Sequence, residues 1–139
     1  MFSFFRPLEI YTDGSFKNGR GAWAYVVVRR GKVIREASGL VKQVGSNRME
    51  FQAAIEALRS LKKKSKVKIY SDSRILIDAV TLATPVLKKD RPHPYAEQIQ
   101  IIAKLQQGHS ISWQWIKAHS GIKHNERCDE LCIQARGKG

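Results

Sequence analysis

The chain has 139 residues, a length that suits one domain, and 42% of them are hydrophobic, which is enough for one core. Lys and Arg number 25 and Asp and Glu number 12, so the net charge is +13 and polyanionic partners are favoured. No apolar run approaches the ~20 residues that span a bilayer, which excludes the membrane-spanning class.

Residues 1–7 lack the pattern of a secretory signal, so we expect a cytoplasmic protein.

The first third of the chain predicts three strands in an antiparallel meander. Residues 8–12 alternate between apolar and polar side chains, and residues 22–29 and 33–40 are rich in β-forming side chains. Residues 14–21 are rich in Gly, Asn and Lys and predict a turn between the first two strands.

Helices and strands alternate in the rest of the chain. Ser46 or Asn47 can cap a helix that carries Glu50 in its first turn and whose apolar residues recur at helical spacing as far as Leu61. After it we predict a strand over 67–71, a helix over 73–82, a loop over 84–94, a helix over 95–107, a strand over 111–116 and a helix over 125–136.

This order predicts an α/β fold with one mixed sheet that carries helices on its faces. Right-handed crossovers would place the first, fourth and fifth strands parallel, and α/β proteins build their sites at the ends of such strands. Trp113 and Trp115 alternate along the fifth strand, which we take as central, so we expect both in the core. Cys128 and Cys132 have no zinc-spaced partners, and we expect free thiols with at least one packed on the core.

Four acidic residues stand out in this basic chain, and three of them lie beside predicted strands or a core-packed helix. They are Asp13, Glu50, Asp72 and Asp129. Carboxylates gathered at one point repel each other unless cations are present, and Mg²⁺ takes oxygen ligands. An acidic, metal-holding centre in a basic surface is what an enzyme that cuts phosphodiesters needs.

Each acid also has a purely structural interpretation when it is taken alone. Asp13 precedes a glycine and could be a turn residue, and Glu50 could be an acid in the first turn of a helix. Asp72 and Asp129 could cap helices, and His119 could be a loop histidine without a role. Asp129 lies near the start of the last predicted helix, where the helix dipole favours a carboxylate.

Taken together, the motifs around these residues resemble the ribonuclease H type 1 (ribonuclease HI) family over about residues 8–135 of a single domain, 1–139. They are Tyr11-Thr12-Asp13-Gly14-Ser15, Asn47-Arg48-Met49-Glu50, Tyr70-Ser71-Asp72-Ser73, Trp115-Ile116-Lys117-Ala118-His119-Ser120-Gly121 and Asn125-Glu126-Arg127-Cys128-Asp129-Glu130-Leu131. The resemblance implies the ribonuclease H-like mixed five-stranded sheet, with three antiparallel strands followed by parallel strands.

The resemblance also implies an activity and its cofactors. Members of the family hydrolyse the RNA strand of RNA–DNA hybrids and leave 5′-phosphate and 3′-hydroxyl ends, with two Mg²⁺ ions or with Mn²⁺. By resemblance, Asp13, Glu50, Asp72 and Asp129 are the four metal-binding carboxylates. His119 then assists proton transfer or product release, as a loop histidine that titrates near neutrality can.

The same resemblance suggests contacts to the hybrid, whose RNA strand is distinguished by its 2′-hydroxyls. The candidate substrate-binding residues are Gly14, Ser15, Asn18, Ser46, Asn47, Arg74, Lys88 and Lys89. Asn47 could contact the substrate, cap its helix, or do both. The basic handle of some bacterial members is cut down here to the loop over residues 84–94.

Two other functions remain open. One is a DNA-processing nuclease of the same fold, such as a transposase, integrase or junction resolvase. The other is a module that binds hybrids without cutting, which the loss of one acid would have favoured. We expect a monomer with an RNA–DNA hybrid as its partner and no contact with a membrane.

Overall fold

The computed structural model describes residues 7–42, 45–82, 87–88 and 91–137. Its elements are β1 (Leu8–Lys17), β2 (Arg20–Arg29), β3 (Lys32–Lys42), α1 (Ser46–Arg59), β4 (Lys66–Ser71), α2 (Arg74–Thr81), β5 (Leu87–Lys88), β6 (Arg91–Pro92), α3 (Ala96–Gln106), β7 (Ser110–Trp115) and α4 (Lys123–Gly137). The predicted order is confirmed, except that β5 and β6 pair as a short hairpin within the predicted loop.

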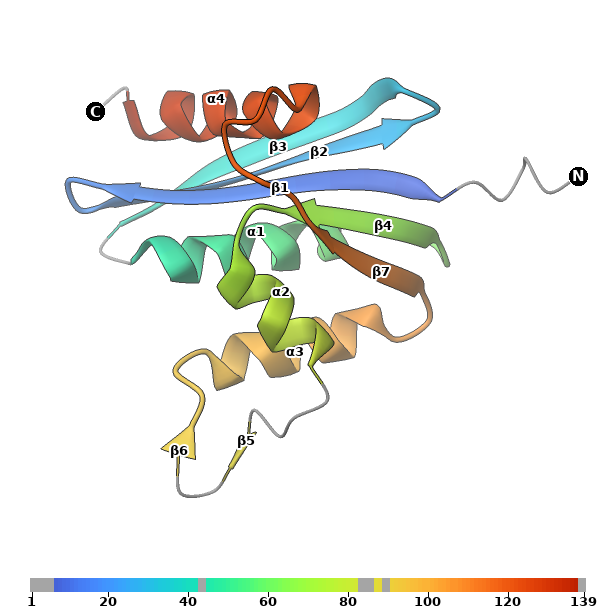
Figure 1. The fold of residues 1–139 in the computed structure, drawn as a ribbon, viewed down its shortest axis with the longest axis vertical. Coiled ribbons are helices and arrows are strands. Elements are labelled where there is room, and N and C mark those ends of the chain that lie inside the picture. Colours follow the sequence, from blue (N-terminus) through green and yellow to red (C-terminus); the bar gives the residue numbers. More distant parts are fainter. Residues whose placement is uncertain (1–6, 43–44, 83–86, 89–90, 138–139) are drawn as a thin grey trace, which may run out of the picture.

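Five strands form one mixed sheet in the order β3-β2-β1-β4-β7 (Figure 1). β1 pairs with β2 and β2 with β3 in antiparallel register, while β4 runs parallel to both β1 and β7. The predicted meander and the predicted parallel strands are therefore confirmed. β7 is an edge strand, however, and not the central strand that the sequence suggested.

The edge position of β7 changes the environment of its two tryptophans. Trp113 is half-buried against the core, and its Nε1 donates to the side chain of Gln106 at 3.2 Å. Trp115 is also half-buried, and the guanidinium of Arg74 lies 4.0 Å from the centre of its ring. The prediction that both rings are core residues is thus wrong for Trp115, because an edge strand leaves one side of its residues uncovered.

β1 is longer than its apolar pattern predicted. Its pairing with β2 continues from Asp13↔Ala24 to Lys17↔Arg20, so the turn is reduced to Asn18 and Gly19. Both turn residues have positive φ angles, 53° and 75°, which Asn and Gly adopt at the lowest cost. The predicted turn over residues 14–21 is therefore mostly strand, and Asp13 lies within the sheet.

The two faces of the sheet carry separate hydrophobic clusters. Ile10 points into the cluster that α1 covers together with α2 and α3, and its neighbour Tyr11 points to the opposite face beneath α4 (Figure 1). Cys128 and Cys132 are buried and free on the side of α4 that faces the sheet. Both donate to β1 carbonyls, at 3.2 Å and 3.6 Å, so the prediction of packed, reduced cysteines is confirmed.

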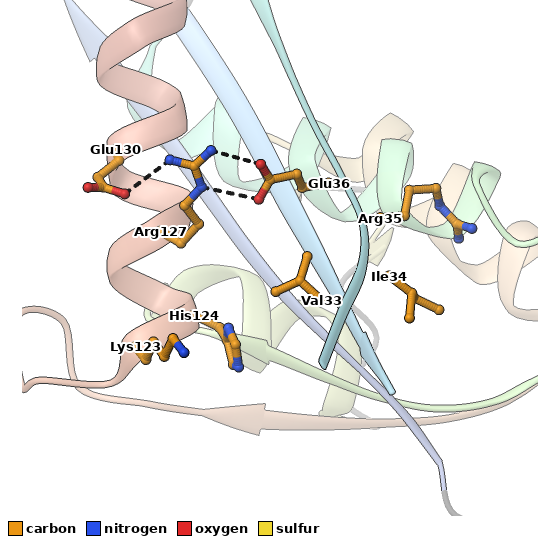
Figure 2. A pocket seen from close by; sticks show the side chains of 8 residues that line it. All are labelled: Val33, Ile34, Arg35, Glu36, Lys123, His124, Arg127 and Glu130. Atoms are coloured by element: carbon orange, nitrogen blue, oxygen red, sulfur yellow. Dashed lines mark hydrogen bonds and ion pairs between the residues drawn. The ribbon is translucent and has the colours of Figure 1, made fainter. Parts of the chain in front are cut away.

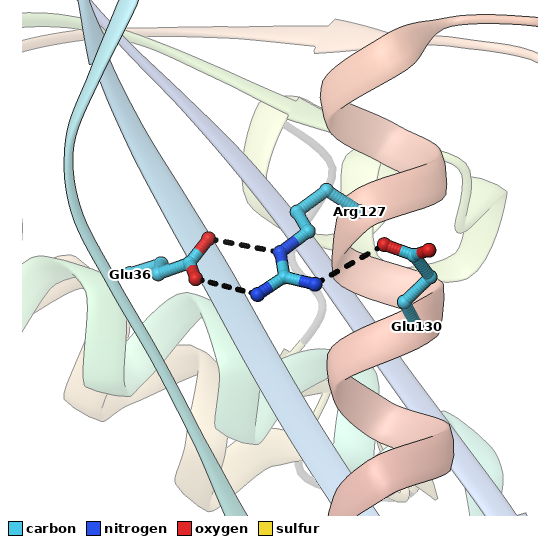
Figure 3. A network of polar contacts seen from close by, with 3 residues as sticks. All are labelled: Glu36, Arg127 and Glu130. Atoms are coloured by element: carbon cyan, nitrogen blue, oxygen red, sulfur yellow. Dashed lines mark hydrogen bonds and ion pairs between the residues drawn. The ribbon is translucent and has the colours of Figure 1, made fainter.

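An ion-pair network joins the outer part of α4 to β3. The guanidinium of Arg127 donates to both carboxylate oxygens of Glu36, at 3.1 Å and 2.8 Å, and to Glu130 at 3.2 Å (Figure 3). These groups border a hollow of about 570 Å³ between α4 and the start of β3 (Figure 2). The network attaches the first half of α4, which follows the loop from β7, to β3.

The start of α4 also differs from the prediction, because the helix begins at Lys123 rather than at Asn125. None of the helices within the described ranges is both long and apolar enough to cross a membrane.

Candidate active site

Three carboxylates from three different elements meet at one point beside β1. Oxygen atoms of Asp13, Glu50 and Asp72 all lie within 4.8 Å of one another. The last pair between β1 and β4 is Tyr11↔Tyr70, so Asp13 lies where β1 has run past the end of its neighbour. Asp72 follows the end of β4 directly, and the two parallel strands thereby bring both aspartates to the same edge.

The third carboxylate depends on an unusually close approach of α1 to β1. A Cβ atom at Gly14 would overlap the backbone of Met49 and Glu50, so only glycine allows this contact. The N–H of Gly14 donates to Oδ1 of Asp13 at 3.0 Å. Glu50 is the fifth residue of α1 and thus lies beyond the first turn in which the sequence placed it.

The beginning of α1 also differs from the predicted cap. Gly45 occupies the N-cap position, and no side-chain hydrogen bond caps the helix within the described part of the chain. Ser46 and Asn47 are the first two helical residues, so neither is the cap.

Burial and mutual repulsion make the ionised form of this cluster unfavourable. Burial, followed by the charges of Asp72 and Asp129, raises the pKa of Asp13 from 3.8 to about 8. Burial, followed by the charges of Asp13 and Asp72, raises the pKa of Glu50 as well. A bound cation would reverse this effect, because an opposite charge nearby favours the ionised carboxylates.

A hard divalent cation fits the donor set of this site. Oε1 of Glu50 is buried and accepts no hydrogen bond within the described parts of the chain. Buried acceptors without a partner are rare and call for a missing ligand or water. Three carboxylates with one such oxygen match the oxygen ligands that Mg²⁺ and Mn²⁺ prefer.

Two residues that the sequence analysis did not assign to the site hold Asp72 in place. The buried amide of Asn125 donates to Oδ2 of Asp72 at 3.3 Å, and Nε1 of Trp115 donates to its backbone carbonyl at 3.1 Å. Burial raises the pKa of Asp72, and the Asn125 hydrogen bond opposes that rise. Both residues lie within the motifs quoted in the sequence analysis. That position was the signal by which sequence reasoning could have found them.

Asp129 lies near the three clustered carboxylates but is not one of them. It is half-buried at the middle of α4, which begins at Lys123, so the predicted support from the helix dipole is wrong. Its charge nevertheless contributes to the raised pKa of both Asp13 and Asp72, after their burial. Asp129 thus faces the site from the α4 side of the sheet.

His119 lies in the loop between β7 and α4. Its side chain is exposed and its φ angle is 53°, in a region that non-glycine residues seldom occupy. The histidine charge opposes the burial that raises the pKa of Asp72, so the imidazole is within electrostatic reach of the site. An exposed histidine beside the carboxylates can exchange protons with solvent.

The structure describes some of the predicted substrate contacts and not others. Ser15 is half-buried on β1, Asn18 is exposed in the β1–β2 turn, and Asn47 is half-buried on α1. Arg74 is exposed at the start of α2, where it stacks on Trp115. The side chains of Ser46 and Lys88, and the whole of Lys89, lie outside the part of the chain that the structure describes.

Comparison with known proteins places the whole chain among similar sequences. A family model described as RNase H matches residues 6–136. The chain is 39% identical over 135 residues to the Ribonuclease H of Hahella chejuensis, which covers 91% of this chain and 90% of the relative. It is 34% identical over 139 residues to the Ribonuclease H of Erythrobacter litoralis, covering 94% and 96% respectively.

Solved structures with lower sequence identity share the fold. LC9-RNase H1, described as a type 1 RNase H with the type 2 active-site motif, superposes with a TM-score of 0.80 at 24% identity, covering 94% of this chain and 72% of that one. LC11-RNase H1 in complex with an RNA/DNA hybrid superposes with a TM-score of 0.70 at 20% identity, covering 92% and 98%. The mixed sheet described above is therefore the fold of these proteins.

Proposed function

The chain belongs to the ribonuclease H family, and from this membership we propose that it hydrolyses the RNA strand of RNA–DNA hybrids as a metal-dependent endonuclease. The products would carry 5′-phosphate and 3′-hydroxyl ends. The observation that carries the proposal is the convergence of Asp13, Glu50 and Asp72 at one edge of the sheet. Without bound cations the three carboxylates repel one another, and with bound cations they serve as metal ligands.

Asp13, Glu50 and Asp72 would hold two Mg²⁺ ions, or Mn²⁺, with Asp129 as a fourth ligand from α4. When bound, the two ions supply the positive charge that activates a water nucleophile and stabilises the departing 3′ oxygen. Asn125 and Trp115 keep the carboxylate of Asp72 oriented through their two hydrogen bonds. The protein thus supplies carboxylates that its strands and helices already hold in position.

His119 would act on protons rather than on the ions. Its imidazole is exposed in the loop before α4 and can carry a proton between solvent and the reacting phosphate. The same exposure leaves the imidazole free to move as the cut strand departs. Either role makes His119 helpful to turnover without making it a ligand.

Two properties support a hybrid as the substrate. The net charge of +13 suits a polyanion, and the related LC11-RNase H1 has been crystallised with an RNA/DNA hybrid. Gly14, Ser15, Asn18, Ser46, Asn47, Arg74, Lys88 and Lys89 would contact the two strands. We propose further that the protein works as a single-domain monomer in the cytoplasm.

The deciding experiment follows cleavage of one labelled strand in RNA–DNA, RNA–RNA and DNA–DNA duplexes, each with Mg²⁺ or with EDTA. We expect metal-dependent cutting of the RNA strand in the hybrid alone. Cutting of DNA would indicate a DNA-processing nuclease of the same fold. Binding of the hybrid without cutting, in the presence of Mg²⁺ and of Mn²⁺, would indicate a binding module and contradict the assigned chemistry.

A further inference from the structure

A hollow of about 420 Å³ lies between the β1–β2 turn and the last turn of α4. It is lined by Lys17, Asn18, Arg20, Ile133, Arg136 and Gly137. All of its ionisable lining residues are cations, and no acid among the described residues lines it. Three positive groups gathered around one hollow repel each other unless an anion is present, just as the carboxylates nearby need a cation.

A second hollow, near the start of α4, contains an arginine whose charge is neutralised by neighbouring acids. There the guanidinium of Arg127 is held by Glu36 and Glu130, so the charge of this arginine is neutralised within the protein (Figures 2 and 3). Among the described residues, no acid lines the hollow beside the β1–β2 turn. Its cations are therefore available to a ligand.

The hollow lies on the same face of β1 as Asp13. Alternation along the strand places Asp13, Ser15 and Lys17 on the face that α4 covers. Oγ of Ser15 on β1 and Nε of Arg136 on α4 are buried, and neither has a hydrogen-bond partner within the described residues. Unsatisfied buried groups of this kind are uncommon, and an oxygen-rich ligand would satisfy the arginine donor.

The side chain of Arg20 is held against the end of α4. Nη1 of Arg20 donates to the backbone carbonyl of Arg136 at 3.1 Å, which anchors the end of α4 to the start of β2. One of the five donors of this guanidinium is thereby used, and the others remain. Although burial raises the pKa of Asp13, the charge of Arg136 opposes the rise, so Arg136 lies within electrostatic reach of the site.

We propose that Lys17, Arg20 and Arg136 form a binding site for a backbone phosphate of the nucleic-acid substrate, beside the phosphate that is cut. The inference rests on the proposed function, because it assigns the ligand as part of the same hybrid. The site would fix the position of the strand relative to the carboxylates. It recognises phosphate and carries no sequence information.

The test compares variants that each remove one positive charge. Lys17→Gln and Arg136→Gln alter the hollow, and Lys66→Gln is the matched control, because Lys66 is exposed at the start of β4, away from the end that Asp72 follows. Michaelis constants for hybrid cleavage are measured between about 50 and 200 mM KCl. Circular dichroism melting shows that each variant is folded, and Arg136→Lys tests whether charge alone restores binding.

For Lys17→Gln and Arg136→Gln we expect a higher KM at low salt, an unchanged kcat, and a slope of log KM against log salt that is smaller by about 0.9. The ratio of the variant KM to the wild-type KM then falls by about three- to fourfold between about 50 and 200 mM KCl. Lys66→Gln should keep the wild-type slope. Should Arg136→Gln fail to fold, the exposed Lys17 carries the test by itself.

Unchanged KM values and slopes in both variants would overturn the proposed site. A fall in kcat at constant KM would overturn it too, since Arg136 would then act on Asp13 and not on the substrate. Anisotropy with a labelled hybrid in the Asp13→Asn background separates this inference from the proposed function. Wild type that cuts no hybrid refutes the function, whereas equal affinities with and without Lys17→Gln in that background refute the phosphate site.

Discussion

Replacement of Asp13 by asparagine should stabilise the protein when no metal is bound. Asp13 is only 7% exposed, and its burial next to Asp72 and Asp129 raises its pKa from 3.8 to about 8. A carboxyl group with a raised pKa in the folded state costs stability wherever it must be ionised. The free energy of unfolding of the wild type should therefore fall as the pH rises from about 4 to about 8.

The size of the expected stabilisation follows from the rise in the pKa of Asp13. From 3.8 to about 8 is roughly four pH units, and at 1.36 kcal/mol per unit this corresponds to about 5 kcal/mol at pH 8 and above. The asparagine amide removes the charge but remains a buried polar group with its own desolvation cost. We expect a net gain of about 2–4 kcal/mol at pH 8, which raises Tm by roughly 6–12 °C in a chain of this size.

The assay is urea unfolding followed by circular dichroism, with EDTA, at about pH 4 and about pH 8. Asp78→Asn on α2 is the control, because Asp78 is exposed and its replacement changes the net charge equally. The gain from Asp13→Asn should be present at the higher pH and should disappear at the lower pH. Saturating Mg²⁺ should reduce the difference in free energy of unfolding between the variant and the wild type, since bound Mg²⁺ stabilises the wild type more than the variant.

Two results would refute the reasoning. One is equal stability of the wild type and Asp13→Asn at the higher pH with EDTA present. The other is a stability difference of the same size at both pH values, which would show that it arises from packing and not from the carboxylate charge.

The remaining predictions concern the site and its surroundings. Asp72→Asn should leave the circular dichroism spectrum unchanged and remove nearly all cleavage; turnover at the wild-type rate would contradict its role as a ligand. Gly14→Ala should cost about 2–3 kcal/mol in urea unfolding, because the new Cβ overlaps the α1 backbone; Gly45→Ala, which has open space, should cost less than about 1 kcal/mol. His119→Ala should slow cleavage while calorimetry shows unchanged Mg²⁺ binding; loss of that binding would make His119 a ligand. Cleavage at subsaturating substrate should fall steeply as KCl rises, through release of counterions, and a flat profile would argue against extended phosphate contacts.

The sequence by itself determined the order of the elements and the candidate acids. The β-forming side chains of residues 22–29 and the helical spacing of Phe51, Ala54 and Leu58 are local patterns that follow from which side chains must be buried. The acids were visible because they are few in a basic chain and lie within recognisable motifs. Their meeting at one edge followed from the parallel strands, since the end of β4 brings Asp72 beside β1.

Only the tertiary structure decided which strand is an edge, how far β1 extends and what holds each carboxylate. β7 is an edge strand because nothing pairs beyond it within the described residues, and no pattern within residues 111–116 encodes the absence of a neighbour. The hydrogen bond from Asn125 to Asp72 joins residues 53 positions apart. The hollow around Lys17 and Arg136 likewise arises from segments at opposite ends of the chain. Such features depend on distances between residues far apart in sequence, which local composition and periodicity do not contain.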